Sequence, residues 1–125
     1  MLGLIGALLA IQTMEPWKQD WPAEMLWARV TTNQERFWIR SKDYKPGVSR
    51  GFTVWLHGDH SQNSAVSYRS SVWRIYFNCD GTMTLSASTT IDPDGRSKSW
   101  DGYQNSYIRP GTMYEDIEQK FCPKN

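Results

Sequence analysis

The sequence predicts an α+β fold in which an antiparallel β-sheet of about five to six strands packs on one C-terminal helix. The chain has 125 residues, which suits one domain with one core. Aromatic residues make up 14% of the chain, and flat rings favour the pleated, half-buried surface of a sheet. Several segments also alternate apolar and polar residues with a period of two, which is typical of strands.

The first 23 residues are expected to lie outside this domain. Residues 1–10 are an uncharged apolar run, too short to span a bilayer and similar to the core of a secretory signal peptide. Residues 11–23 are polar and contain Pro16 and Pro22, as in a linker. We therefore expect an exported protein of the periplasm or cell surface, with a signal-like segment and linker over residues 1–23, a single domain over residues 24–125 and no membrane span in the mature chain. The alternative is an apolar segment that is retained in the fold.

The first two strands are predicted as a hairpin. Residues 25–31 and 36–40 both alternate, with Asn33 and Gln34 in the turn between them. We expect the core side of this hairpin to carry Leu26, Ala28, Val30, Phe37 and Ile39, and the opposite side to carry Trp27, Arg29, Arg36, Trp38 and Arg40. Residues 41–51 contain a Pro-Gly pair and are predicted to be a loop.

Three more strands follow, over residues 52–57, 71–79 and 82–91. Asp80-Gly81 predicts a two-residue hairpin turn between the last two, and the Pro-Asp-Gly at residues 93–95 predicts a turn after them. The residues expected to face the core are Phe52, Val54, Leu56, Trp73, Ile75, Phe77, Cys79, Met83, Leu85, Ala87 and Ile91.

The end of the chain predicts a helix. Thr112 is a good N-cap, and Glu115 stands three residues later, as in a capping box. Met113, Ile117 and Phe121 recur every four residues and form one apolar stripe.

Cys79 and Cys122 are the two cysteines, and neither has metal-ligand spacing. Such a pair is either one disulfide or two buried thiols, and the compartment decides between them. Export predicts that the pair is oxidised. A Cys79–Cys122 bridge would then attach the helix to the apolar face of the strand that ends at Cys79.

The order of these features resembles the surface-adhesin protein E family of small exported bacterial domains. The resemblance covers residues 27–122. It rests on the following motifs: Phe37-Trp38-Ile39-Arg40, Val54-Trp55, Asn78-Cys79 before a hairpin, Trp100, Ile108-Arg109-Pro110-Gly111-Thr112, a short helix and Cys122. It implies an antiparallel sheet on a C-terminal helix, one disulfide and no catalytic centre. One member of the family binds host extracellular proteins such as vitronectin, laminin and plasminogen.

The charge balance and the motifs of the chain argue against nucleic-acid binding and against catalysis. Lys and Arg total 14 against 13 Asp and Glu, which argues against a nucleic-acid binder. No serine stands in a nucleophile elbow, and nothing implies a cofactor. His57 and His60 flank Asp59 and are the one compact set of candidate metal ligands, so a small metal-dependent hydrolase is the alternative from another class. We expect no metal, because three candidate ligands in one short polar loop rarely converge on an ion without a fourth from elsewhere. We expect no enzyme, because no serine stands in an elbow and both histidines are confined to that loop.

The strongest functional candidate is the side of the sheet opposite the core. Alternation gathers aromatic and Arg side chains there, the types enriched at binding hot spots. The predicted binding face consists of Trp27, Arg29, Arg36, Trp38, Arg40, Trp55, Arg74 and Tyr76. The hypothesis is a non-enzymatic domain, monomeric or homodimeric, that binds a host extracellular or envelope protein. The alternatives are a structural component of the envelope, or packing of these side chains within the molecule.

Overall fold

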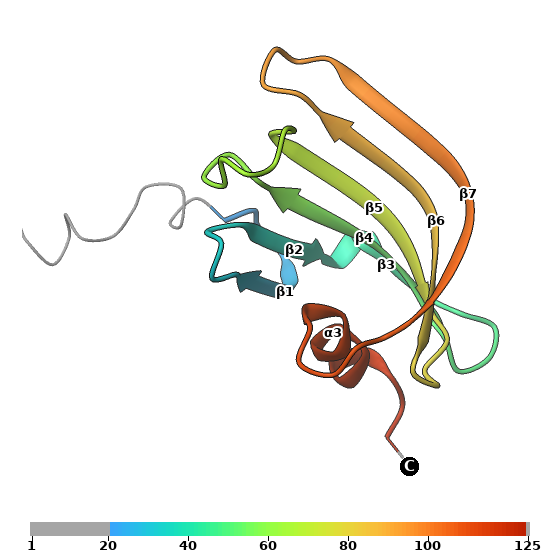
Figure 1. Ribbon diagram of the computed structural model, residues 1–125. Coiled ribbons are helices and arrows are strands. Elements are labelled where there is room, and N and C mark those ends of the chain that lie inside the picture. The colour runs from blue at the N-terminus through green and yellow to red at the C-terminus, as the bar shows by residue number, and fades with distance from the viewer. Residues whose placement is uncertain (1–20, 125) are drawn as a thin grey trace, which may run out of the picture.

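A computed structural model describes residues 21–124, so most of the predicted signal-like segment and linker lies outside the described residues. The elements are β1 (Met25–Val30), β2 (Arg36–Arg40), the 3₁₀ helix η1 (Ser41–Asp43), β3 (Tyr44–Pro46), β4 (Phe52–Asp59), β5 (Ser70–Phe77), β6 (Thr82–Ile91), β7 (Ser97–Tyr107) and α3 (Met113–Phe121). The strands form one antiparallel sheet in the order β1-β2-β4-β5-β6-β7, with β3 also paired to β4. The sheet is strongly curved, and α3 lies on its concave side (Figure 1). In the described part of the chain, no helix is long and apolar enough to cross a membrane.

The predicted α+β class is confirmed, but the sheet has seven strands instead of five to six. The added strands are β3 and β7. β3 lies within the predicted loop, where η1 interrupts the chain so that β2 and β3 pair with opposite halves of β4. β7 is a polar edge strand whose burial does not alternate, so no period of two marks it in the sequence. It forms because its backbone N–H and C=O groups pair with those of the long strand β6, from Ile91 to Thr82.

The core lies between the concave face of the sheet and α3. It consists of Trp27, Phe37, Ile39, Phe52, Val54, Leu56, Ile75, Phe77 and Ile117. Phe52 and Phe77 stack with ring centroids 5.0 Å apart, and Phe121 from α3 lies 5.5 Å from Phe52. The predicted helix stripe is confirmed, since Ile117 is fully buried and Met113 and Phe121 pack against this core.

Strand β1 faces the opposite way from the prediction. Trp27 is 7% exposed and belongs to the core, whereas Leu26 and Val30 are 37% and 38% exposed. Both sides of this segment carry apolar residues, so alternation alone could not decide between them. Trp27 faces the core because burying its indole removes more apolar area from water than burying Leu26 or Val30 would.

Strand β6 changes face in its middle. Ile75 pairs with Leu85 but Arg74 pairs with Ala87, so Ser86 is an extra residue in the ladder. Its hydroxyl accepts a hydrogen bond from Arg74 Nε at 2.8 Å. One extra residue moves every later side chain to the other face, and Ala87 and Ile91 therefore lie on the convex side, not in the core as predicted.

The turn after β5 is longer than the predicted two residues. The Asn78 backbone N–H donates to Thr82 O, which leaves Cys79, Asp80 and Gly81 in the loop. Cys79 has a φ of 61°, in the left-handed region that non-glycine residues rarely adopt, so it leaves the strand instead of extending its apolar face.

Helix α3 is joined to this turn by two links. The predicted Cys79–Cys122 disulfide is confirmed. Glu118 accepts a hydrogen bond from the Gly81 backbone N–H at 3.0 Å. At the other end Thr112 is the N-cap, but its hydroxyl donates to Arg109 O and does not form the predicted capping box.

We expect reduction of the disulfide to lower the free energy of unfolding by about 4 kcal/mol, from the loop-entropy model for a separation of 43 residues. Urea unfolding of oxidised and reduced protein measures this difference, and thiol titration of the unreduced, denatured chain checks that no cysteine is free. A double Cys79→Ser, Cys122→Ser variant should unfold alike with and without reductant. A difference below about 1 kcal/mol would mean that the bridge does not hold the helix.

Candidate functional site

The convex face of the sheet carries six of the eight residues of the predicted binding face: Arg36, Trp38, Arg40, Trp55, Arg74 and Tyr76. The other two were placed wrongly. Trp27 pairs with Ile39 and Arg29 with Phe37, so both share the concave side with those core residues. Arg29 there approaches Asp116 of α3 at 3.9 Å.

Arg36 is held within the molecule. It is 8% exposed, and its guanidinium lies 3.0 Å from the carboxylate of Asp59. The same group stands over the rings of Trp21 and Trp38, at 5.0 and 5.7 Å from their centroids. Burial alone would raise the pKa of Asp59, but hydrogen bonds from Ser61 and Arg36 lower it below its usual value. The Arg36–Asp59 pair therefore stays ionised and stabilises the end of the sheet, with little left to offer a partner.

Arg40 is also engaged, in a cluster with Asp43 and His57. Its Nε and Nη2 contact the two carboxylate oxygens of Asp43 at 2.7 and 3.2 Å, and Nη2 lies 3.0 Å from His57 Nε2. His57 stacks on Trp38 with centroids 5.6 Å apart. Burial lowers the pKa of His57, and Asp43 offsets this only in part. The imidazole is therefore neutral at neutral pH, and its Nε2 also lies 3.1 Å from Asp43 Oδ2.

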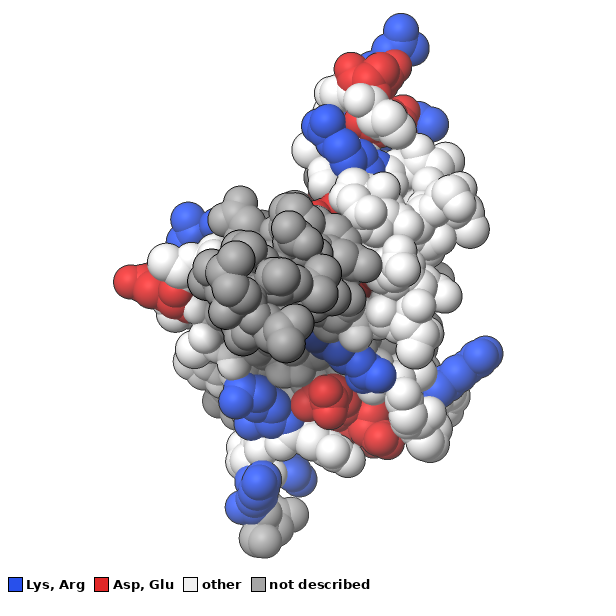
Figure 2. All heavy atoms as spheres, turned by 90° about the vertical axis from the view of Figure 1, so that its left-hand side faces the viewer, with Lys and Arg blue, Asp and Glu red and all other residues white. Residues whose placement is uncertain are grey.

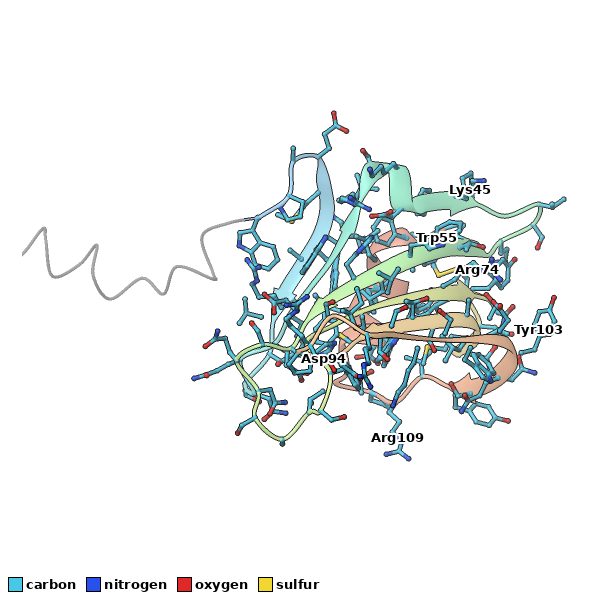
Figure 3. The ribbon with its side chains drawn as sticks, turned by 90° about the horizontal axis from the view of Figure 1, so that it is seen from above. Lys45, Trp55, Arg74, Asp94, Tyr103 and Arg109 are labelled. Carbon is cyan, nitrogen blue, oxygen red and sulfur yellow. A yellow bond between two sulfur atoms is a disulfide. The ribbon has the colours of Figure 1, made fainter. Side chains whose placement is uncertain are left out.

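The other three residues of the predicted binding face lie farther along the convex face and are half-buried. Trp55 pairs with Arg74 across the strands, and Arg74 lines a groove of about 520 Å³. The groove, which we call the convex groove, is lined by Arg74, Tyr76, Thr84, Ser86, Tyr103 and Asn105. Figure 3 shows Trp55, Arg74 and Tyr103 following one another on the side of the sheet away from α3. Tyr103 is 87% exposed and was missed from the sequence because strand β7 was not predicted.

The two histidines do not share a site. His57 lies on the convex face beside Trp38, whereas the ring of His60 packs on Phe37 on the concave side. Within residues 21–124, no group of three or more His, Cys, Asp and Glu side chains is placed to hold a metal ion. The geometry therefore gives the metal-dependent alternative no common centre at His57 and His60.

His60 instead joins a buried cluster that the sequence did not reveal. Its Nδ1 contacts Glu35 Oε2, and its Nε2 lies 2.7 Å from Ser71 Oγ. This order of contacts, serine to histidine to carboxylate, is that of a hydrolase triad. Ser71 is only 3% exposed, however, and a Cβ atom at Gly58 would lie 2.7 Å from both Ser71 Oγ and His60 Nε2. Because the Gly58 backbone covers the hydroxyl, no room remains for an acyl group, and the cluster joins the β1–β2 turn to β4 and β5.

Comparisons with models of protein families, with curated proteins and with solved structures find no match to this chain. The resemblance to the surface-adhesin protein E family stays a prediction from its motifs. The convex groove and the side chains around it are therefore the features of this chain that bear on its function.

We expect the Arg40–Asp43–His57 cluster to make stability depend on pH. Because folding lowers the pKa of His57 below 6.5, the folded state binds this proton less readily than the unfolded chain does. The stability contribution is full above pH 6.5 and falls as the pH drops, by at most about 1.4 kcal/mol per pH unit for one proton. His57→Gln, measured by urea unfolding between about pH 5 and 8, should show a shallower decline than the unsubstituted protein. Parallel curves would contradict this assignment, in which the facing groups are Arg40, Lys42 and Asp43.

We expect Ser71 to have a structural role. Ser71→Ala leaves His60 Nε2 without its partner and should lower the free energy of unfolding by about 1–3 kcal/mol. The matched change Ser70→Ala, on the convex side of the same strand, should stay within about 0.5 kcal/mol. A fluorophosphonate probe, which labels activated serines, should leave the protein unlabelled. Labelling that disappears in Ser71→Ala would instead establish a working triad.

Proposed function

We propose that the protein is a non-enzymatic, exported bacterial domain that binds a protein partner through the convex groove and the adjoining Trp55. The observation that carries this proposal is the convex groove itself, in which the exposed Tyr103 lies beside the half-buried Arg74 and Tyr76. The half-buried Trp55 adjoins it across the strands from Arg74, and within residues 21–124 none of these side chains is paired with a carboxylate as Arg36 and Arg40 are. Trp, Tyr and Arg are the residues most enriched among those that dominate binding energy at protein interfaces.

These side chains are held in place before any partner arrives. Arg74 Nε donates to Ser86 Oγ at 2.8 Å, which limits the rotamers of the guanidinium. Tyr76 rests on the backbone of Gly51, where a Cβ atom would collide with the phenol. Ordered side chains lose less conformational entropy on binding, so more of the contact energy appears as affinity.

Two further points support export and adhesion. The Cys79–Cys122 bridge suits an oxidising compartment such as the periplasm or the cell surface. The motif resemblance to the surface-adhesin protein E family implies the same location and a protein ligand. A host extracellular or envelope protein is therefore the class of partner that we propose.

We expect Trp55→Ala and Tyr103→Ala to weaken partner binding by about tenfold or more while thermal stability changes little. Surface plasmon resonance against purified vitronectin, laminin and plasminogen measures the affinity, and quantitative capture from native envelope extract covers the second class of partner. The matched control is Trp100→Ala, since Trp100 is an exposed aromatic residue on the concave side of the sheet.

A partner that binds the unsubstituted protein and Trp100→Ala alike, but not the two convex variants, supports the proposal. Equal binding by all variants would move the site elsewhere. Absence of any partner in both assays would favour a structural component of the envelope. A large loss of thermal stability in Trp55→Ala would show that this ring packs internally and does not serve as a contact.

A further inference from the structure

The concave face holds a second pocket, which we call the concave pocket, with a volume of about 220 Å³. Strands β5 to β7 and the first turn of α3 form it together. Its apolar wall includes Trp73, Met83 and Leu85, and its polar lining comes from Gln104, Ser106 and Tyr114. It lies on the opposite side of the sheet from the convex groove, because Leu85 pairs with the inward-facing Ile75.

The pocket exists because α3 is too short to cover the whole concave face. The helix has nine residues, and β5, β6 and β7 run well past it in Figure 1. Beyond the helix, Trp73 pairs with Ser88 and Ser88 with Trp100, so this row of inward positions holds two indoles with a small residue between them. Trp100 is 40% exposed, and its ring lies over Gly102, two residues before Gln104 of the pocket. The pocket is therefore bordered by further aromatic surface.

Charge is sparse around this region. Figure 2 views the concave side, and charged residues at the β6–β7 turn give way to a stretch of uncharged surface beneath it. No Lys, Arg, Asp or Glu side chain lines the pocket. A charged ligand would lose its hydration there without an opposite charge to compensate, so the pocket suits a neutral ligand.

The polar groups of the pocket lack partners of their own. Within residues 21–124, the side chains of Gln104, Ser106 and Tyr114 make no hydrogen bond to one another or to their neighbours. Burial, with a smaller contribution from Tyr68, raises the pKa of Tyr114 to about 12, so its phenol stays a neutral donor at physiological pH. An apolar wall with a few polar groups is typical of small-molecule sites.

We propose that the concave pocket binds a small, neutral aromatic molecule of one ring or two fused rings that carries a hydrogen-bonding group. An apolar cavity of about 150 Å³ is enough to take up benzene, so a volume of 220 Å³ suits a ring with a substituent or a fused bicycle. The ring packs edge-to-face or offset against Trp73, and its polar group hydrogen-bonds to Tyr114, Gln104 or Ser106. This activity is separate from protein binding by the convex groove.

The test is a titration of ¹⁵N-labelled protein with indole and p-cresol, followed by amide chemical shifts. We expect saturable shifts centred on β6, β7 and the start of α3, with a Kd of about 1 mM or tighter. Leu85→Phe fills the pocket and should weaken binding about tenfold or more. Tyr114→Phe removes one hydroxyl and should weaken binding by about fivefold. Tyr103→Ala, on the convex face, should leave binding unchanged, which separates this site from the proposed protein-binding surface.

Four results would overturn the proposal. The first is that millimolar indole and p-cresol cause no change in amide chemical shifts. The second is that the same changes persist in the Leu85→Phe variant, whose ¹⁵N spectrum shows that it is folded. The third is binding of N-acetyl-tryptophanamide much more tightly than indole at the same residues, because the pocket would then receive a side chain of a partner protein. Equal loss of binding in Tyr103→Ala would likewise place the ligand outside the concave pocket.

Discussion

The attachment of α3 to the concave face is the constraint on which the rest of the structure depends. A helix of nine residues is too short to be stable alone in water, so its stability must come from tertiary contacts. Ile117 supplies the buried contact, and the disulfide to Cys79 and the Glu118–Gly81 hydrogen bond hold the helix against one end of the sheet. The left-handed backbone at Cys79 turns that residue out of the strand and toward the helix. The helix thereby covers part of the concave face and leaves the pocket beside its first turn open.

This arrangement separates the chemistry of the two faces. At the β2 end of the convex face, the charges of Arg36 and Arg40 are neutralised by Asp59 and Asp43, and aromatic rings stack over them. The Arg36–Asp59 pair joins β2 to β4, and the two pairs together leave fewer arginines of this face available to a partner. Toward β7 the same face keeps the exposed Tyr103 and the half-buried Tyr76 and Arg74, while the concave face keeps an apolar pocket beside the first turn of α3. The two candidate sites therefore lie where the internal contacts end.

Sequence patterns predicted much of the core and less of the candidate sites. Phe52, Val54 and Leu56 were placed correctly because strict alternation in a central strand leaves one face for the core. Residues joined only by tertiary contacts could not be found in this way: Glu35 is 25 positions from His60, and Asp43 was part of a predicted loop. Tyr103 and Gln104 lie on β7, which is held to β6 by backbone hydrogen bonds. Backbone hydrogen bonds do not require apolar and polar residues to alternate, so the sequence pattern did not predict this strand.

By itself, the sequence determined the fold class, most of the strands, the helix with its apolar stripe and the pairing partner of each cysteine, because these depend on local periodicity and on the presence of two thiols. The tertiary structure decided which face each residue of β1 and of the second half of β6 occupies. Those outcomes depend on competition between an indole and smaller side chains, and on one extra residue at Ser86. It also decided which arginines remain available, because β4 brings Asp59 beside Arg36 and the 3₁₀ turn η1 folds Asp43 back onto Arg40.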